Sequence, residues 1–186
     1  MPAFRSLEPR TAQLLGMLRK TDRWLILMNA DPDALASAMA LRRIMARRVA
    51  AVDCAQVNEI SRPDNLTMIK SLRIPVQRLT PNLGAQFDRF ALVDSQPHHH
   101  PGFQGYAFSL VFDHHPLNPE APVQADFVDI QPAYGATSSL LTEYLYNLKI
   151  RPGELLATAL LYGIKTDTQS FERHFADVDV RAFRYL

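Results

Sequence analysis

The sequence has a single cysteine, Cys54, among its 186 residues. One cysteine cannot form an intrachain disulfide, and it excludes a metal cluster held by several thiolates. No apolar run approaches the roughly 18 to 20 residues that cross a bilayer. The N-terminal stretch MPAFRSLEPRTAQLL lacks the apolar core of a secretory signal peptide. We therefore expect a cytoplasmic protein with no membrane segment.

The net charge is also close to zero, and glycines are few. The 20 Lys and Arg residues balance 19 Asp and Glu residues, for a net charge of +1. That balance argues against a protein that coats nucleic acid by bulk charge, although it permits a small basic pocket. Only seven glycines are present, and no G-x-G-x-x-G or G-x-S-x-G segment occurs. A dinucleotide-binding domain and a Ser-His-Asp hydrolase are therefore excluded.

What the sequence does contain is an alternation of apolar strands with helical segments. Strands are predicted at 23–28, 49–58, 90–97, 106–116 and 121–130, the last of them at a sheet edge. Helices are predicted at 6–22, 33–48, 61–72, 135–149, 152–168 and 176–186, with Asp64 or Asn65 as the N-cap of the third. This alternation predicts an α/β fold whose sheet is largely parallel and has helices on both faces. The length fits one domain.

Acidic and histidine residues gather where these strands and helices end. They fall in the stretches LILMNADPD, ALVDSQP, LVFDHHP and GIKTDT, and comprise Asp31, Asp33, Asp94, Asp113, His114, His115 and Asp167. Ligands of open α/β sheets bind outside the carboxyl ends of the strands, so we expect these side chains to converge there. Carboxylates with imidazole suit Mn²⁺ or Mg²⁺. One or two such ions would offset the repulsion between the neighbouring carboxylates and could promote attack of water on a phosphate.

Each of these residues also has a purely structural interpretation. Asp33 alone could be a helix N-cap, Asp94 could begin a turn, the DHH stretch could be a polar turn, and Asp167 could end a helix. We prefer the metal site because all four features fall together at predicted strand or helix ends.

The same stretches resemble, in order, the motifs of the DHH phosphoesterase family, named after the sequence at 113–115. DPDALAS resembles the first motif, VDSQP the second, DHHP the third, and GATSSLL with GIKTDTQSF the later ones. The family includes RecJ-type exonucleases, short-oligonucleotide and phosphoadenosine-phosphate hydrolases, cyclic dinucleotide phosphodiesterases and manganese-dependent pyrophosphatases. The resemblance implies a Mn²⁺- or Mg²⁺-dependent phosphoesterase acting on a small nucleotide or a short oligonucleotide.

The resemblance also implies a metal ligand set. Asp94 would bridge two ions. One ion would be held by Asp33, Asp94, His114 and Asp167. The other ion would be held by Asp31 and Asp94.

Further roles follow by the same resemblance. His115 would face the scissile phosphate as a catalytic group, and Asp113 would orient the neighbouring histidines. The segment SRPDN resembles one found in some subgroups of the family, which makes Arg62 and Asn65 candidates for substrate contacts.

The sequence departs from the family pattern in two places. The first motif normally begins with a metal-binding histidine, and Leu27 occupies that position. Leucine cannot bind a hard cation, so either one ion binds, or the run His98–His100 supplies a substitute, or the domain has become an impaired regulatory or nucleotide-binding domain. The usual smaller C-terminal substrate-binding domain is also missing, so we interpret 1–186 as a DHH catalytic domain and expect further domains in the full-length protein. The sequence leaves a homodimer open, and it offers no cluster of cations for a pyrophosphatase or polyphosphatase.

Overall fold

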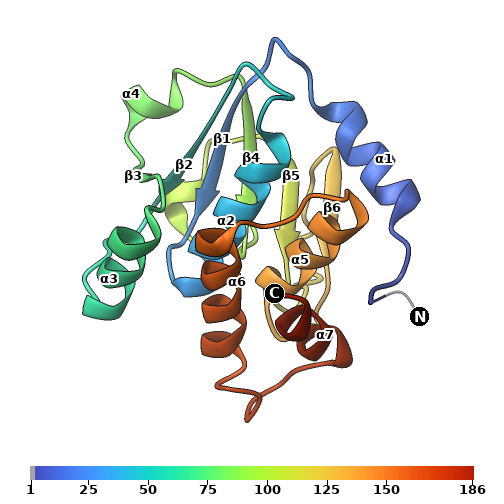
Figure 1. The fold of residues 1–186 in the computed structure, drawn as a ribbon. Helices are drawn as coiled ribbons and strands as arrows, with labels where there is room; N and C mark the ends of the chain where they lie inside the picture. The colour runs from blue at the N-terminus through green and yellow to red at the C-terminus, as the bar shows by residue number, and fades with distance from the viewer. Residues whose placement is uncertain (1–2) are drawn as a thin grey trace.

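All the strands form one sheet in which every neighbouring pair runs parallel. The computed structural model describes residues 3–186 and places six strands in the order β3-β2-β1-β4-β5-β6 (Figure 1). They are β1 (Arg23–Met28), β2 (Ala51–Gln56), β3 (Val76–Arg78), β4 (Arg89–Val93), β5 (Phe108–Asp113) and β6 (Phe127–Ile130). The predicted α/β class is confirmed, and β6 lies at an edge as expected.

The two faces of the sheet are covered unequally. The larger apolar core lies under the longer helices, which are α1 (Glu8–Met17), α2 (Pro32–Met45), α3 (Pro63–Leu72), α5 (Thr137–Asn147) and α6 (Glu154–Asp167). In Figure 1, α2 and α6 lie in front of the sheet, and α7 (Asp177–Tyr185) packs against α5 and α6. The opposite face carries a smaller cluster beneath connecting segments, α4 (Pro81–Gly84) and the short 3-10 helix η1 (Pro101–Phe103). None of the helices within residues 3–186 has both the length and the apolar character needed to span a membrane.

Strand β1 is apolar along its length because both of its faces are covered. Trp24, Ile26 and Met28 belong to the larger core, whereas Leu25 and Leu27 belong to the smaller cluster. All five side chains are fully buried. Burial on both sides is the reason that this strand shows no alternation of polar and apolar residues.

The strand order places a crevice between β1 and β4. The chain leaves β1 towards β2 and β3 on one side, and later leaves β4 towards β5 and β6 on the other. Connections that diverge in this way open a gap outside the carboxyl ends of the two central strands. The segments that carry Asp31 and Asp94 begin at this gap.

The structure corrects several predicted boundaries. Helix α3 begins at Pro63 with Arg62 as its N-cap, so the predicted N-cap at Asp64 or Asn65 is wrong. Proline favours the first helical position because its missing N–H would have no helical partner there. The first helix and the second strand are shorter than predicted, and β3 and α4 were not predicted. Both missed elements are too short to give a periodic pattern.

Candidate metal centre

His114 lies at the centre of the candidate site. Its Nδ1 is 3.1 Å from the carbonyl oxygen of Tyr134, and because a carbonyl can only accept, Nδ1 carries the proton. Three carboxylate oxygens surround the other ring nitrogen, Nε2: Asp167 Oδ2 at 3.1 Å, Asp94 Oδ1 at 3.5 Å and Asp33 Oδ2 at 3.9 Å. This buried Nε2 makes no hydrogen bond of acceptable geometry. Because Nδ1 keeps its proton, Nε2 is the ring nitrogen that faces this cluster of oxygens, and its lone pair becomes available to a metal ion when its own proton is lost.

Asp33 is held by a helix other than its own. Its Oδ2 accepts a hydrogen bond from the Thr137 N–H at 2.7 Å, and its Oδ1 accepts one from the Ser138 N–H at 2.8 Å. The fully buried carboxylate thus caps the first turn of α5, whose own N-cap residue provides no side-chain hydrogen bond. Gly163 of α6 permits the close contact, since a Cβ there would lie 3.1 Å from Asp33 Cα and 2.5 Å from Ser138 Oγ. The helix N-cap interpretation of Asp33 is wrong for α2, where Asp31 is the N-cap.

Asp94 directly follows β4 in a left-handed backbone conformation, with φ of 54°. A positive φ is uncommon for a residue other than glycine, and asparagine and aspartate tolerate it best. The side chain is buried and accepts a hydrogen bond from Thr137 Oγ1 at 2.8 Å. The conformation turns Asp94 towards His114, to which Asp33 and Asp167 also point.

Asp31 stands apart from these side chains. Its Oδ1 accepts a hydrogen bond from the Ala34 N–H at 2.9 Å and caps α2. Within residues 3–186, none of the groups of three potential ligand atoms includes Asp31. Leu27, at the position of the missing histidine, is fully buried in the smaller apolar cluster.

In the histidine run after β4, His99 and His100 make local hydrogen bonds, and His99 also forms a group of potential ligand atoms with Asp113 and His115. Nδ1 of His99 accepts a hydrogen bond from the Gln96 N–H, and Nδ1 of His100 accepts one from the Gly102 N–H. A neutral imidazole whose Nδ1 accepts carries its proton on Nε2, so in this tautomer Nε2 is a donor.

His115 and Asp113 form a hydrogen-bonded pair at the end of β5. His115 Nδ1 lies 2.7 Å from Asp113 Oδ1, and the hydrogen bond keeps the proton on Nδ1. Gln96 donates to the other carboxylate oxygen, Oδ2, at 2.8 Å and also contacts the carbonyl oxygens of His115 and Pro116. The pair is therefore fixed from two sides, while the His115 side chain stays 42% exposed.

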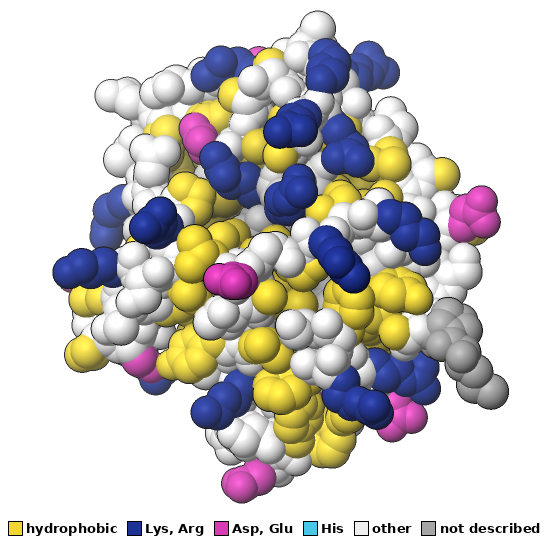
Figure 2. Space-filling view, in the orientation of Figure 1, with side chains coloured by type: hydrophobic (Ala, Val, Ile, Leu, Met, Phe, Trp, Pro, Cys, Tyr) yellow, Lys and Arg dark blue, Asp and Glu magenta, His cyan; other side chains and the backbone are white. Residues whose placement is uncertain are grey.

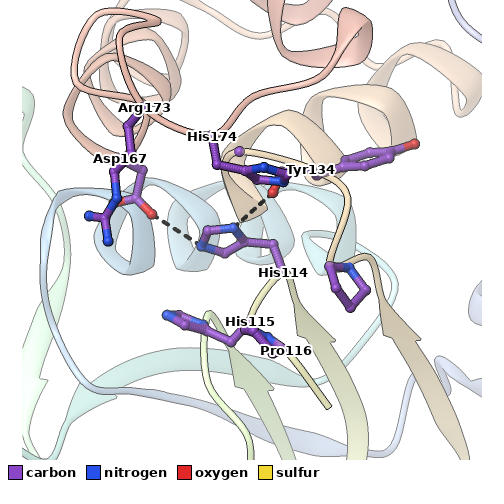
Figure 3. Close-up of a pocket in the computed structure, with 9 residues that line it drawn as sticks. His114, His115, Pro116, Tyr134, Asp167, Arg173 and His174 are labelled. Atoms are coloured by element: carbon purple, nitrogen blue, oxygen red, sulfur yellow. Dashed lines mark hydrogen bonds and ion pairs between the residues drawn. The ribbon is translucent and has the colours of Figure 1, made fainter.

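A cavity of about 380 Å³ opens over these histidines (Figure 3). Its lining includes His114, His115, Asp167 and two residues that sequence reasoning missed, Arg173 and His174. Both belong to the segment between α6 and α7, and no motif pointed to them. The role of Gln96 was also missed, although its place inside the stretch DSQP could have drawn attention to it.

The two predicted substrate contacts lie elsewhere. Arg62 is largely exposed and pairs with Asp64 at 2.9 Å, and Asn65 is buried in the first turn of α3. Neither residue lines the cavity above His114.

The electrostatics of the site are dominated by buried carboxylates packed close together. Burial and the charges of Asp33 and Asp31 raise the pKa of Asp94 well above its ordinary value. Burial disfavours a charged His114, but Asp167 and Asp33 outweigh burial and raise the pKa of His114 to about 9. Burial disfavours a charged Asp113, but the hydrogen bonds from His115 and Gln96 together with the charge of His115 outweigh burial and lower the pKa of Asp113.

These features fit a divalent cation. Three carboxylates and an imidazole whose buried Nε2 faces them form a hard donor set of the kind that Mn²⁺ and Mg²⁺ prefer. Such an ion would sit among Asp33, Asp94, His114 and Asp167, and it would replace the proton that His114 otherwise retains.

We expect the stability conferred by a metal ion to increase with pH. A group whose pKa is raised by folding stabilises the metal-free protein at pH values below the group's ordinary pKa. This stabilisation is lost as the pH rises through the group's pKa in the folded protein. For His114 that loss spans pH 6.5 to about 9, and the raised pKa of Asp94 acts in the same direction. Mg²⁺ competes with those protons. The Tm difference between Mg²⁺ and EDTA should therefore be larger at pH 9 than at pH 6.5, and an equal difference would contradict this assignment.

Comparison with known proteins places the chain in a family. Residues 23–164 match the model of the DHH family, N-terminal domain. Because the match covers most of the chain, the chain belongs to this family, whose members are metal-dependent phosphoesterases. The resemblance noted from the motifs is thereby confirmed.

Three individual proteins show the range of its relatives. The uncharacterised protein MJ1633 of Methanocaldococcus jannaschii is 35% identical over 159 residues, which cover 86% of this chain and 33% of MJ1633. A solved Methanococcus jannaschii protein, provisionally described as a family II inorganic pyrophosphatase, has a TM-score of 0.63 at 19% identity, covering 88% of this chain and 54% of its own. An exopolyphosphatase-related protein from Bacteroides fragilis has a TM-score of 0.69 at 13% identity, covering 95% and 56%.

These comparisons establish the fold but not the substrate. The two solved structures are too distant in sequence to transfer an activity. The chain also spans only about a third of its curated relative and about half of each solved relative.

Proposed function

We propose that this chain is a divalent-metal-dependent phosphoesterase that hydrolyses a phosphate ester of a small nucleotide or a short oligonucleotide. The observation that carries the proposal is the buried Nε2 of His114, which faces three carboxylates beside the His115–Asp113 pair, with both histidines lining one cavity. The cavity volume of about 380 Å³ lies in the range of small-molecule sites.

Each group has a definable task. Asp33, Asp94, His114 and Asp167 would hold Mn²⁺ or Mg²⁺. Such an ion supplies an activated water and offsets charge on a phosphate. The Tyr134 carbonyl oxygen keeps the His114 proton on Nδ1, so that Nε2 remains free to ligate.

His115 is the proposed catalytic group, and Asp113 positions it. The hydrogen bond that His115 donates to Asp113 raises the pKa of His115 despite burial of the ring, which favours an imidazolium. An imidazolium fixed in the cavity offsets the negative charge that develops on a phosphate during hydrolysis. Its position also requires little rearrangement, because Gln96 and Asp113 already hold it.

The charges around the cavity favour an ester over a condensed phosphate. Arg173 is the sole Lys or Arg among the residues that line the cavity within the described part of the chain. Pyrophosphate and polyphosphate carry dense negative charge and require several cations, as does a long nucleic acid. A single phosphate group on a small substrate needs fewer.

The alternative is a domain that kept the fold and lost catalysis. Leu27 supports this second candidate. It is buried among apolar side chains, and within residues 3–186 Asp31 belongs to no group of three potential metal ligands. Further domains, a homodimer and a role for Arg62 or Asn65 stay predictions of the sequence.

The proposal is tested by loading the 186-residue chain with Mn²⁺, measuring bound ions by calorimetry, and assaying hydrolysis. The panel contains a short oligoribonucleotide, a nucleoside bisphosphate, pyrophosphate and polyphosphate. We expect one bound ion per chain and hydrolysis of at least one nucleotide ester ahead of pyrophosphate. Ion binding without any hydrolysis would favour the impaired domain instead.

Leu27→His separates these candidates further. We expect the variant to bind a second ion beside Asp31, and to be less stable without metal because an imidazole replaces a fully buried leucine. Faster hydrolysis with two bound ions would mean that the wild-type chain lacked only a ligand for the ion beside Asp31. Unchanged stoichiometry would show that Asp31 does not belong to a metal site.

A further inference from the structure

We propose that Arg173 binds the non-bridging oxygens of the substrate phosphate, and that a strained turn at 169–171 holds it in place. The inference deepens the proposed function and rests on it. Arg173 lies in the connection between α6 (Glu154–Asp167) and α7 (Asp177–Tyr185), outside the motifs that supplied the other site residues.

Arg173 is an unpaired cation facing the candidate centre. It lines the same cavity as His114, His115 and Asp167, and Figure 3 shows it descending beside Asp167 from the segment above His114. Among the ion pairs and side-chain hydrogen bonds of residues 3–186, none involves the Arg173 guanidinium. Its hydrogen-bond donors are therefore available to a ligand.

The backbone that presents Arg173 is strained. Gln169, Ser170 and Phe171 have φ values of 47°, 60° and 67°, three consecutive left-handed residues without a glycine. A left-handed conformation is unfavourable for a residue with a Cβ, and it persists only where its surroundings enforce it. Strain of this kind gathers at ligand-binding segments.

The surroundings of the turn do enforce it. The Ser170 N–H donates to the Lys165 carbonyl oxygen at 2.8 Å, and the Arg173 N–H donates to the Thr168 carbonyl oxygen at 2.9 Å. The Phe171 ring packs against Phe175 and Phe183, each with ring centroids 5.4 Å away. The turn is therefore a fixed support for Arg173 and not a loose loop.

Gly135 brings this segment against the site. A Cβ at Gly135 would lie 2.7 Å from Thr168 Cγ2 and 2.8 Å from the His174 carbonyl oxygen. Because Tyr134, the residue before it, holds His114, the close approach ties the Arg173 segment to the candidate metal ligands.

The negative charge of the site favours a cation such as Arg173 beside a bound phosphate. One divalent ion offsets only two of the three negative charges of Asp33, Asp94 and Asp167, so an incoming phosphate would still meet net negative charge. His115 is itself partly neutralised by Asp113. A guanidinium binds phosphate through two parallel hydrogen bonds and keeps its charge at every working pH.

The test is a calorimetric titration of inorganic phosphate into the Mg²⁺-loaded chain, with hydrolysis measured in parallel. Arg173→Ala should weaken phosphate binding by about 10- to 100-fold and raise KM more than it lowers kcat. Arg173→Lys should recover part of the binding, because it keeps the charge and loses the paired hydrogen bonds. Mg²⁺ affinity should be unchanged in both variants.

The matched control is Arg151→Ala, since Arg151 is exposed between α5 and α6 and does not line the cavity. It should bind phosphate as the wild type does. Wild-type affinity in Arg173→Ala, or no phosphate binding by the wild type, would overturn the inference. If phosphate binds through Arg173 but no ester is hydrolysed, the proposed function fails and the inference stands.

Discussion

Asp94→Asn is expected to abolish binding of the divalent ion and, with it, hydrolysis. Asp94 faces His114 Nε2 and is buried together with Asp33. An asparagine still offers an oxygen to the Thr137 hydroxyl group but removes the charge that a hard cation requires. Loss of a group that merely supports a ligand costs 10- to 100-fold in affinity, so loss of a ligand should cost more than about 100-fold.

The same substitution should stabilise the metal-free protein. Burial and neighbouring carboxylates raise the pKa of Asp94, so its charge opposes folding near neutral pH when no ion is bound. A higher Tm in EDTA combined with lost Mn²⁺ binding would show that the Asp94 carboxylate destabilises the metal-free protein and is required to bind the ion. Asp126→Asn is the control, because that side chain is 62% exposed and pairs with Arg89. Unchanged Mn²⁺ affinity in Asp94→Asn would refute the metal centre.

His115→Asn is expected to lower kcat by roughly 100- to 1,000-fold, the usual effect of removing one group that stabilises transition-state charge. The His115 side chain stays 42% exposed in the cavity while Asp113 and Gln96 hold it in place. Ion binding should survive, because His114 and the carboxylates around it remain. Single-turnover hydrolysis and Mn²⁺ titration would separate the two effects.

Asp113→Asn should cause a smaller fall in kcat, because it leaves the imidazole present but removes the carboxylate that fixes its proton on Nδ1. His98→Asn is the matched control, since His98 is exposed and does not line the cavity. If His115→Asn lost the ion as well, His115 would be a ligand, which the group Asp94, His114 and His115 would then explain.

The sequence by itself determined the fold class and most of the centre. Apolar strands alternate with helices, and this alternation leads to a parallel sheet because parallel neighbours need a long crossover connection, which is usually a helix. The polar residues at the strand ends then share one edge, so Asp94 and His114 could be predicted as neighbours although 20 positions separate them.

Several roles became visible only in the tertiary structure. Sequence reasoning treated Asp33 as either a ligand or a cap of its own helix, yet its carboxylate caps α5, more than 100 positions away. A hydrogen bond between such distant segments has no local periodicity to reveal it. Tyr134 likewise acts through its carbonyl oxygen, which no side-chain motif encodes.

Arg62 and Arg173 also show that motif membership does not decide which arginine reaches the cavity. Arg62 stands in a motif-like segment, but α3 turns it to solvent beside Asp64. Arg173 stands in no motif, and a left-handed turn pinned by Thr168 and Phe171 directs it into the cavity. Sequence patterns report which face of an element is buried. The direction of a side chain from an irregular connection is set by packing against distant residues, and only the tertiary structure could decide it.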